Sequence, residues 1–340
     1  MAVLDKKGRA FLGIAIIVLA LAMPVACTDK TAEKKRAAQP DKLAICIGGA
    51  PGIPVLLAYE QGLFAREGLE VTLKRYRTGT EGFEDFFKGE CDMAAISETS
   101  TVFKSFDHQD FSILANLSSS NNSGRILVNR KSNIKTPLDL KGKRIFVLIG
   151  SSNHYFLDMY LLNNGLTLKE VRLVDKKDVS DVSEAFKKRV IDAFCATDVN
   201  INKPMKQLGN DAVVFDSPDL CMAYFHLVAR NSLIAVRPDI VRKTLTALVK
   251  SEELVRKNPK QAIKTAAGAM GMDEQDMTAI WAGYRWEISL PQSMLLSFEH
   301  EAKWFMTSGQ TQKTEMPNYL DFVHTDALRA LKPEAVTLIK

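Results

Sequence analysis

The chain has 340 residues, of which 46% are hydrophobic, so it is long enough for about two domains with sizeable cores. Its formal net charge is +5, but residues 1–26 and 28–40 each contribute +2 of this, which leaves only +1 for the rest. A body so close to neutral argues against nucleic-acid binding, which needs a clustered basic face.

The N-terminal 26 residues are predicted to be an export signal peptide. Basic residues precede an apolar run over residues 10–23, which is short for a membrane-spanning helix. The small residues before Cys27 resemble a bacterial lipoprotein cleavage site, which would make Cys27 the lipidated N-terminus of the mature protein. The alternative is an ordinary cut after Ala26. Residues 27–40 are polar and are predicted to form a lipid-anchored flexible tether.

A repeating order of strand, loop and helix follows the tether. The strands are predicted from short apolar runs, and the helices from apolar residues at helical spacing. The predicted strands are 43–48, 69–75 and 92–96, and the predicted helices are 55–67 and 80–88. Polar loops follow these strands at 49–51, 78–81 and 97–100. In an open α/β sheet the ligand binds at this edge, because helix N-termini point into one crevice there.

The same order of strand, polar loop and helix repeats in a second unit that starts near residue 129. Its predicted elements are strands 144–149, 171–174 and 191–197 with helices 153–164 and 179–188. Further strands are predicted at 111–117, 125–129, 212–215 and 222–229. Strands 125–129 and 226–230 are expected to cross between the units as a hinge. The remainder is predicted to be helical, over 238–257, 259–269, 273–284, 291–308 and 324–331.

The four cysteines after Cys27 have no zinc-ligand spacing and no C-x-x-C motif. Cys46, Cys91, Cys195 and Cys221 lie in or beside apolar runs and are expected to be small buried side chains. A disulfide is possible in an oxidising envelope, but the sequence does not assign one. The chain also lacks a phosphate-binding P-loop and a nucleophile elbow, so no catalytic residue, metal or cofactor is predicted.

Several segments resemble bacterial periplasmic substrate-binding proteins of ABC importers. Within this family, the chain resembles the group that takes up sulfonates, taurine, nitrate and thiamine-pyrimidine precursors. The residues that carry the resemblance are 52–64 (GIPVLLAYEQGLF), 67–71 (EGLEV), 89–94 (GECDMA), 139–145 (DLKGKRI) and 150–156 (GSSNHYF). The likeness spans most of residues 41–330 and is more specific for the family than for the ligand.

The resemblance implies an α/β fold of two lobes, the type II-like periplasmic-binding-protein fold, with a two-strand hinge. Each lobe would be an open α/β sheet. Lobe 1 would comprise 41–127 plus 229–340, and lobe 2 would comprise 128–228. The protein would be a lipid-anchored monomer of the periplasm or cell envelope. It would carry a small molecule to an ABC permease and its ATPase, by hinge closure.

The resemblance also places the ligand site in the loops that follow the strands. The expected ligand-binding residues are Pro51, Thr80, Glu81, Ser97, Glu98, Thr99, Ser151, Ser152, Asn153, His154, Tyr155, Asp198 and Asn200. Each Ser or Thr could instead be a simple helix N-cap, and Tyr155 could be an ordinary core aromatic. Hydroxyls and helix N–H groups favour an oxyanion such as a sulfonate or carboxylate.

Acidic residues in these loops complicate a purely anionic ligand. Burying Glu81, Glu98 and Asp198 around an anion would be costly. Either they face solvent and cap helices, or the ligand carries an amine or ring N–H that they accept. Our hypothesis from the sequence is therefore a zwitterion or a polar nitrogen heterocycle, within a class of ligands that also includes sulfonates.

Two other classes of function compete with a transport receptor. The fold resembles that of some pyrimidine-synthesis and menaquinone-pathway enzymes, and turnover of the ligand would identify an enzyme. A ligand-sensing module would need a separate partner, since the chain shows no output segment. The receptor hypothesis agrees best with an export signal and the absence of catalytic motifs.

Overall fold

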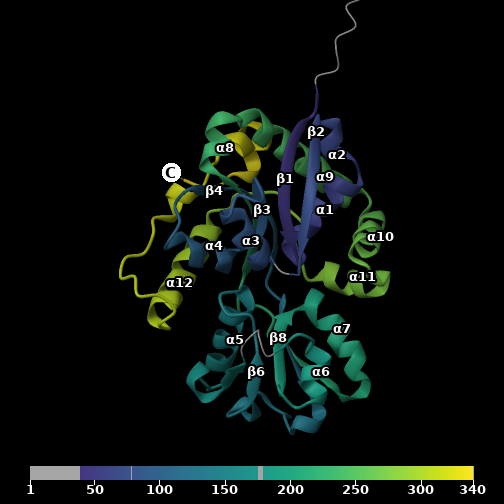
Figure 1. Cartoon of the computed structure of the whole chain (residues 1–340), viewed down its shortest axis with the longest axis vertical. Coiled ribbons are helices and arrows are strands. Elements are labelled where there is room, and N and C mark those ends of the chain that lie inside the picture. Colours follow the sequence, from purple (N-terminus) through teal and green to yellow (C-terminus); the bar gives the residue numbers. More distant parts are fainter. Residues whose placement is uncertain (1–38, 78, 175–178, 340) are drawn as a thin grey trace, which may run out of the picture. The chain divides into compact units, whose positions relative to one another are not determined.

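The computed structural model describes residues 39–77, 79–174 and 179–339, and residues Gln39–Lys340 form one compact unit. The predicted signal peptide, Cys27 and nearly all of the predicted tether lie outside the described residues. Two five-stranded sheets form the framework of the compact unit, and each belongs to one lobe (Figure 1).

The first sheet has the strand order β2-β1-β3-β10-β4. Its strands are β1 (Asp41–Gly48), β2 (Leu69–Tyr76), β3 (Met93–Ser97), β4 (Phe111–Ser120) and β10 (Ala223–Arg230). The helices that connect them are α1 (Ile53–Glu60), α2 (Leu63–Arg66), α3 (Gly79–Phe87) and α4 (Glu98–Ser105). Strands β2, β1 and β3 are parallel, whereas β10 runs antiparallel to β3 and β4. Strands β1, β3, β4 and β10 are largely buried, as expected for a sheet covered on both faces, whereas only Leu69 of the edge strand β2 is buried.

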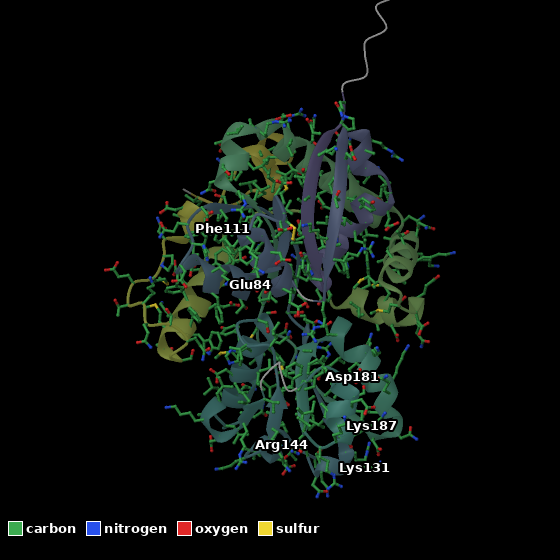
Figure 2. All side chains as sticks on the ribbon, viewed as in Figure 1. Glu84, Phe111, Lys131, Arg144, Asp181 and Lys187 are labelled. Atoms are coloured by element: carbon green, nitrogen blue, oxygen red, sulfur yellow. A yellow bond between two sulfur atoms is a disulfide. The ribbon has the colours of Figure 1, made fainter. Side chains whose placement is uncertain are left out.

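The second sheet has the order β7-β6-β8-β5-β9. Its strands are β5 (Gly124–Asn129), β6 (Arg144–Phe146), β7 (Arg172–Val174), β8 (Ala193–Thr197) and β9 (Ala212–Phe215). Its helices are α5 (Ser152–Asn163), α6 (Val182–Lys187) and α7 (Asp198–Leu208). Separate hydrophobic clusters cover its two faces. Arg144 begins β6 and pairs with Asp192 at 2.8 Å, at the end of the strand away from Phe146 (Figure 2).

The C-terminal helices complete the first lobe. They are α8 (Asn231–Val236), α9 (Pro238–Lys257), α10 (Pro259–Met270), α11 (Glu274–Ala282), α12 (Ser293–Thr307) and α13 (Asp326–Leu331). Side chains of α9 and α12, such as Leu245, Leu248 and Phe298, belong to the same buried cluster as the first sheet. None of the helices among the described residues is long and apolar enough to cross a membrane.

The two-lobed α/β fold was predicted correctly, but several elements differ from the prediction. The predicted helix 55–67 is two helices, because Gly62 lies between them with a left-handed φ of 66°. The predicted strand 144–149 ends at Phe146, because the chain turns where Ser151 donates to the Leu148 carbonyl. The sequence analysis did not predict α7 and α8: α7 contains Pro204, which disfavours a helix interior, and α8 has only six residues.

The prediction that strands 125–129 and 226–230 cross between the lobes as a hinge was also wrong. Among the residues that the structure describes, strand β5 pairs within the second sheet, from the Gly124–Thr197 pair onward, and β10 pairs within the first. The chain crosses between the sheets through the short segments 121–123 and 216–222. The predicted lobe boundaries at 127/128 and 228/229 therefore fall inside strands.

A disulfide joins Cys46 of β1 to Cys91, two residues before β3, across 45 residues of chain. The sequence left this pairing open. Its Cα–Cα distance of 5.8 Å lies in the ordinary range for a disulfide. The bond ties the two strands whose ends support the loops at 49–51 and 97–100. Cys195 is buried and Cys221 is half-buried, and both carry free thiols.

We predict that the double substitution Cys46→Ala/Cys91→Ala lowers the free energy of unfolding by about 2–4 kcal/mol, because the cross-link restricts the unfolded chain. Urea unfolding under non-reducing conditions measures this loss. The control is Cys221→Ala, whose stability should stay within about 1 kcal/mol of the parent protein. Equal stability of the double variant and the parent would contradict a structural disulfide.

Candidate functional site

One cavity, called the main cavity below because residues of both sheets line it, lies where the carboxyl ends of strands from the two sheets meet. Helices α3, α4, α5 and α7 all begin there, at Gly79, Glu98, Ser152 and Asp198. The cavity volume is about 130 Å³, roughly ten times the space that one water molecule needs. Its lining residues are Gly48, Gly49, Ala50, Pro51, Arg77, Gly79, Thr80, Ser97, Phe146, Leu148, Ser151, Ser152, Asn153, Val182, Phe194, Cys195, Ala196, Thr197, Asn200 and Phe225.

The first lobe contributes a chain of hydroxyl groups to the cavity wall. Ser97, the N-cap of α4, accepts a hydrogen bond from the backbone N–H of Ser100. The Ser100 hydroxyl in turn lies 3.0 Å from the Ser97 hydroxyl and 2.9 Å from that of Thr80. This network fixes the orientation of Ser97 and Thr80, so their hydroxyls are preorganised at the cavity.

Close backbone approach at the start of α3 requires glycine. A Cβ atom on Gly79 would lie 3.0 Å from the Ala95 carbonyl oxygen and 3.2 Å from the Ile96 Cα. Without a side chain, the first turn of α3 can lie directly against β3. The positive end of the helix dipole is thereby brought to the cavity, where it favours a bound anion.

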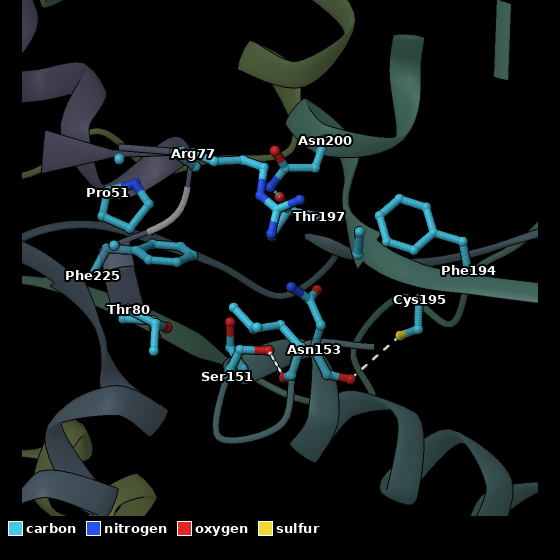
Figure 3. A pocket seen from close by; sticks show the side chains of 18 of the residues that line it. Pro51, Arg77, Thr80, Ser151, Asn153, Phe194, Cys195, Thr197, Asn200 and Phe225 are labelled. Atoms are coloured by element: carbon cyan, nitrogen blue, oxygen red, sulfur yellow. Dashed lines mark hydrogen bonds between the residues drawn. The ribbon is translucent and has the colours of Figure 1, made fainter. Parts of the chain in front are cut away.

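Arg77 is the one cation among the residues that line the cavity in the described chain, and no carboxylate lines it there. Its guanidinium lies 3.3 Å from Glu81, and its side chain is 46% exposed, so it can exchange this partner for a ligand. Figure 3 shows the guanidinium of Arg77 and the amides of Asn153 and Asn200 directed toward the same space. Asn200 donates to the Thr197 hydroxyl at 3.2 Å.

The structure brings seven of the thirteen residues expected to bind ligand to this cavity. They are Pro51, Thr80, Ser97, Ser151, Ser152, Asn153 and Asn200. The side chain of Asp198 and the whole of Thr78 lie outside the described residues. Glu81 lies beside the cavity, as the ion-pair partner of Arg77, and is not part of its lining.

Four of the expected residues point away from the main cavity. Glu98, Thr99 and His154 are at most 1% exposed and are buried in the protein interior. Each follows a lining residue by one or two positions at the start of a helix, so its side chain points in a different direction around the helix axis. Tyr155 packs edge-on against Trp304 of α12, with ring centroids 5.1 Å apart.

Sequence reasoning missed Arg77 and the aromatic residues Phe146, Phe194 and Phe225. Arg77 directly precedes the loop that was singled out, so the position of a cation at a strand end was an available signal. The phenylalanines lie in apolar strand segments that are indistinguishable from core by pattern alone.

Behind the cavity, Glu98 of α4 and Glu301 of α12 are buried together, at 1% and 2% exposed. Glu98 accepts a hydrogen bond from the backbone N–H of Tyr224 at 3.0 Å. Burial, followed by repulsion from Glu301, raises the pKa of Glu98 well above its ordinary value. Burial likewise raises the pKa of Glu301, to about 8. Both carboxyls therefore hold protons at neutral pH more tightly than ordinary glutamates.

Glu301 also lines a small second cavity of about 20 Å³ between the segments that connect the lobes. Its walls come from residues 121–124, the start of α5 and residues 221–223. The acid pair thus lies next to the hinge. In the described part of the chain, no group of three or more His, Cys, Asp or Glu could hold a metal ion.

Comparison of the sequence with known proteins assigns the chain to a family. The family model described as NMT1/THI5 like matches residues 52–262. A candidate binding protein of Brucella abortus is 24% identical over 227 residues, which cover 65% of this chain and 68% of that protein. A candidate aliphatic sulfonates-binding protein of Bacillus subtilis is 27% identical over 203 residues, which cover 58% of this chain and 60% of that protein.

Solved structures share the fold. The alkanesulfonate-binding protein SsuA of Xanthomonas axonopodis pv. citri, bound to MOPS, has a TM-score of 0.71 and 19% identity, covering 88% of this chain and 99% of its own. The periplasmic aliphatic sulphonate binding protein SsuA of Escherichia coli has a TM-score of 0.70 and 19% identity, covering 84% and 97%. The desulfurization enzyme DSZB has a lower TM-score of 0.61 and 14% identity, covering 86% and 99%.

We predict that the free energy of unfolding falls as pH rises from 6.5 to 8, by at most about 1.4 kcal/mol per pH unit for each carboxyl. The sign follows because the folded state binds the protons of Glu98 and Glu301 more tightly than the unfolded chain does. Burial lowers the pKa of His154 to about 4 and that of His226 to about 3, so these side chains cost stability only below about pH 6.5.

Urea unfolding at pH 6.5 and pH 8 measures this slope. Glu301→Gln should flatten it, and Glu299→Gln on the same helix should not. A parent protein with equal stability at both pH values, or the same slope in Glu301→Gln, would show that the pair does not hold its protons in this range.

Proposed function

We propose that this protein, which belongs to the NMT1/THI5 like family, is a solute receptor that captures a sulfonate-like anion between its two lobes. The observation that carries the proposal is the cavity itself. Helix N-termini from both lobes, two preorganised hydroxyls and the Arg77 guanidinium converge on it, and no carboxylate lines it among the described residues. Such a site stabilises a negative charge.

The Arg77 guanidinium and the helix N-termini at the cavity favour a simple anion over an uncharged nitrogen heterocycle. Glu98 is buried away from the cavity and accepts a hydrogen bond from the backbone N–H of Tyr224. Glu81 is paired with Arg77. A taurine-like zwitterion is also compatible with this site. Its sulfonate would pair with the Arg77 guanidinium, and its ammonium group would pair with Glu81, which lies beside Arg77. The relatives named for sulfonate binding support the same class of ligand.

The proposed mechanism is closure of the two lobes over the ligand. A ligand that contacts both lobes binds the closed state preferentially and shifts the population toward it. Contacts between lobes are already in place: Lys206 of α7 pairs with Asp273 and Asp276 near α11, at 2.6 and 2.5 Å. On another side, Trp304 of α12 donates to Asp158 of α5 at 2.5 Å.

In this proposal the closed form delivers its ligand to an ABC permease and its ATPase. The protein works as a monomer in the periplasm or cell envelope, held at the membrane by a lipid on Cys27. The relatives described as periplasmic or as binding proteins support this setting. Labelling with a radioactive or alkyne-tagged fatty acid, lost in Cys27→Ala, would test the anchor.

The enzyme alternative has one feature in its favour, the likeness to the desulfurization enzyme. Cys195 lines the cavity, but its thiol donates to the Asn153 carbonyl oxygen at 3.3 Å, and burial raises its pKa. A thiol that stays protonated is a poor nucleophile. A receptor leaves its ligand unchanged, so product formation from a bound sulfonate would favour the enzyme.

We predict that Arg77→Gln weakens the binding of methanesulfonate and taurine by about 10- to 100-fold. A hydrogen bond to a charged group contributes about 1.5–3 kcal/mol, which corresponds to this range. Isothermal titration calorimetry measures both affinities, and nitrate and an aminopyrimidine complete the ligand panel.

The matched control is Arg285→Gln, since Arg285 lies in a different groove along β4. That variant should bind like the parent protein. The proposal fails if no anion of the panel binds, or if both substitutions weaken binding equally.

A further inference from the structure

The main cavity has an aromatic side as well as a charged one. Phe146 of β6 and Phe194 of β8 are neighbours in the register of the second sheet, and both line the cavity. Their ring centroids lie 5.4 Å apart, with only 12° between the ring planes. Val182 and Ala196 extend this apolar wall. A sulfonate head alone would have no use for such a surface, because a charged group gains nothing from apolar contact.

A third ring comes from the other lobe. Phe225 of β10 pairs with Ser97 across the first sheet and lines the same cavity. Figure 3 shows the rings of Phe225 and Phe194 on opposite sides of the polar groups of Arg77 and Asn153. Phe225 also packs against Tyr284, with ring centroids 5.7 Å apart, and is only 1% exposed, so its ring is fixed in place.

The volume limits what can fit between these rings. The cavity of about 130 Å³ is close to the roughly 150 Å³ of an engineered apolar cavity that binds benzene. One six-membered ring therefore occupies most of this volume, and a second fused ring would extend beyond it. Aromatic rings prefer offset-stacked or edge-to-face contacts with other rings, and these contacts add to the gain from burial.

We propose that the ligand is an aromatic acid with a single six-membered ring. Its ring would lie between Phe225 of the first lobe and the Phe146–Phe194 pair of the second, with its acid group toward Arg77 and the helix N-termini. This inference rests on the proposed function and narrows it, because it separates the protein from relatives named for alkane or aliphatic sulfonates. Because the ring would contact both lobes, its apolar contacts would also stabilise the closed state.

The test is isothermal titration calorimetry of the protein with four sulfonates. We expect benzenesulfonate to bind at least about 10-fold more tightly than methanesulfonate, since it buries a whole ring. It should also bind more tightly than cyclohexanesulfonate, which has a similar size but no π system, and than 2-naphthalenesulfonate, which exceeds the cavity. Methanesulfonate binding as tightly as benzenesulfonate would overturn the inference.

Two variants make the test specific for the aromatic wall. Phe194→Leu keeps an apolar side chain but removes the ring, so the preference for benzenesulfonate over methanesulfonate should fall by about 2- to 10-fold. Phe186→Leu is the matched control, because Phe186 belongs to the same buried cluster but does not line the cavity. An equal loss of preference in both variants would contradict the proposed role of Phe194.

The outcomes separate this inference from the proposed function. If methanesulfonate binds in an Arg77-dependent manner and the ring adds no affinity, the receptor stands and the aromatic ligand is wrong. If none of the four sulfonates binds to protein that still melts cooperatively, the proposed function fails with it.

Discussion

The structure depends on one electrostatic constraint, the convergence of helix N-termini at the carboxyl edges of two sheets. Each of these termini carries backbone N–H groups and a partial positive charge. Bringing α3, α4, α5 and α7 together concentrates this charge around one cavity. A bound anion would offset the cost of that arrangement, which supports our proposal of a negatively charged ligand. Gly79 contributes to this arrangement, because the absence of a side chain lets the first turn of α3 lie directly against β3.

A second set of contacts connects the cavity to the hinge. Ser97 lines the cavity, and the next residue, Glu98, holds the backbone of Tyr224 just after the second connecting segment. Glu98 also faces Glu301, which lines the small cavity between both connecting segments. A change at the ligand site is therefore only a few covalent and hydrogen bonds from the segments that would move. The buried acid pair keeps this region uncharged while it holds its protons.

The sequence predicted the architecture well because strand and helix periodicities were clear and a family resemblance supported them. It was less informative where tertiary context decides. Gly62 divided one predicted helix, and pairing within each sheet, which no local pattern records, removed β5 and β10 from the hinge. The loops after strands that the sequence singled out do reach the cavity, since Thr80, Ser97 and Ser151 line it, and their role in ligand binding stays a prediction. Helix rotation, which sends Glu98 and His154 inward, could not be deduced from loop composition.

The most direct measurement is an experimental structure of the protein with a bound sulfonate. The account predicts that the acid group lies within hydrogen-bond distance of the Arg77 guanidinium and the first turn of α3, with both lobes in contact with the ligand. A sulfonate found instead beside Arg285, in the groove along β4, would contradict it.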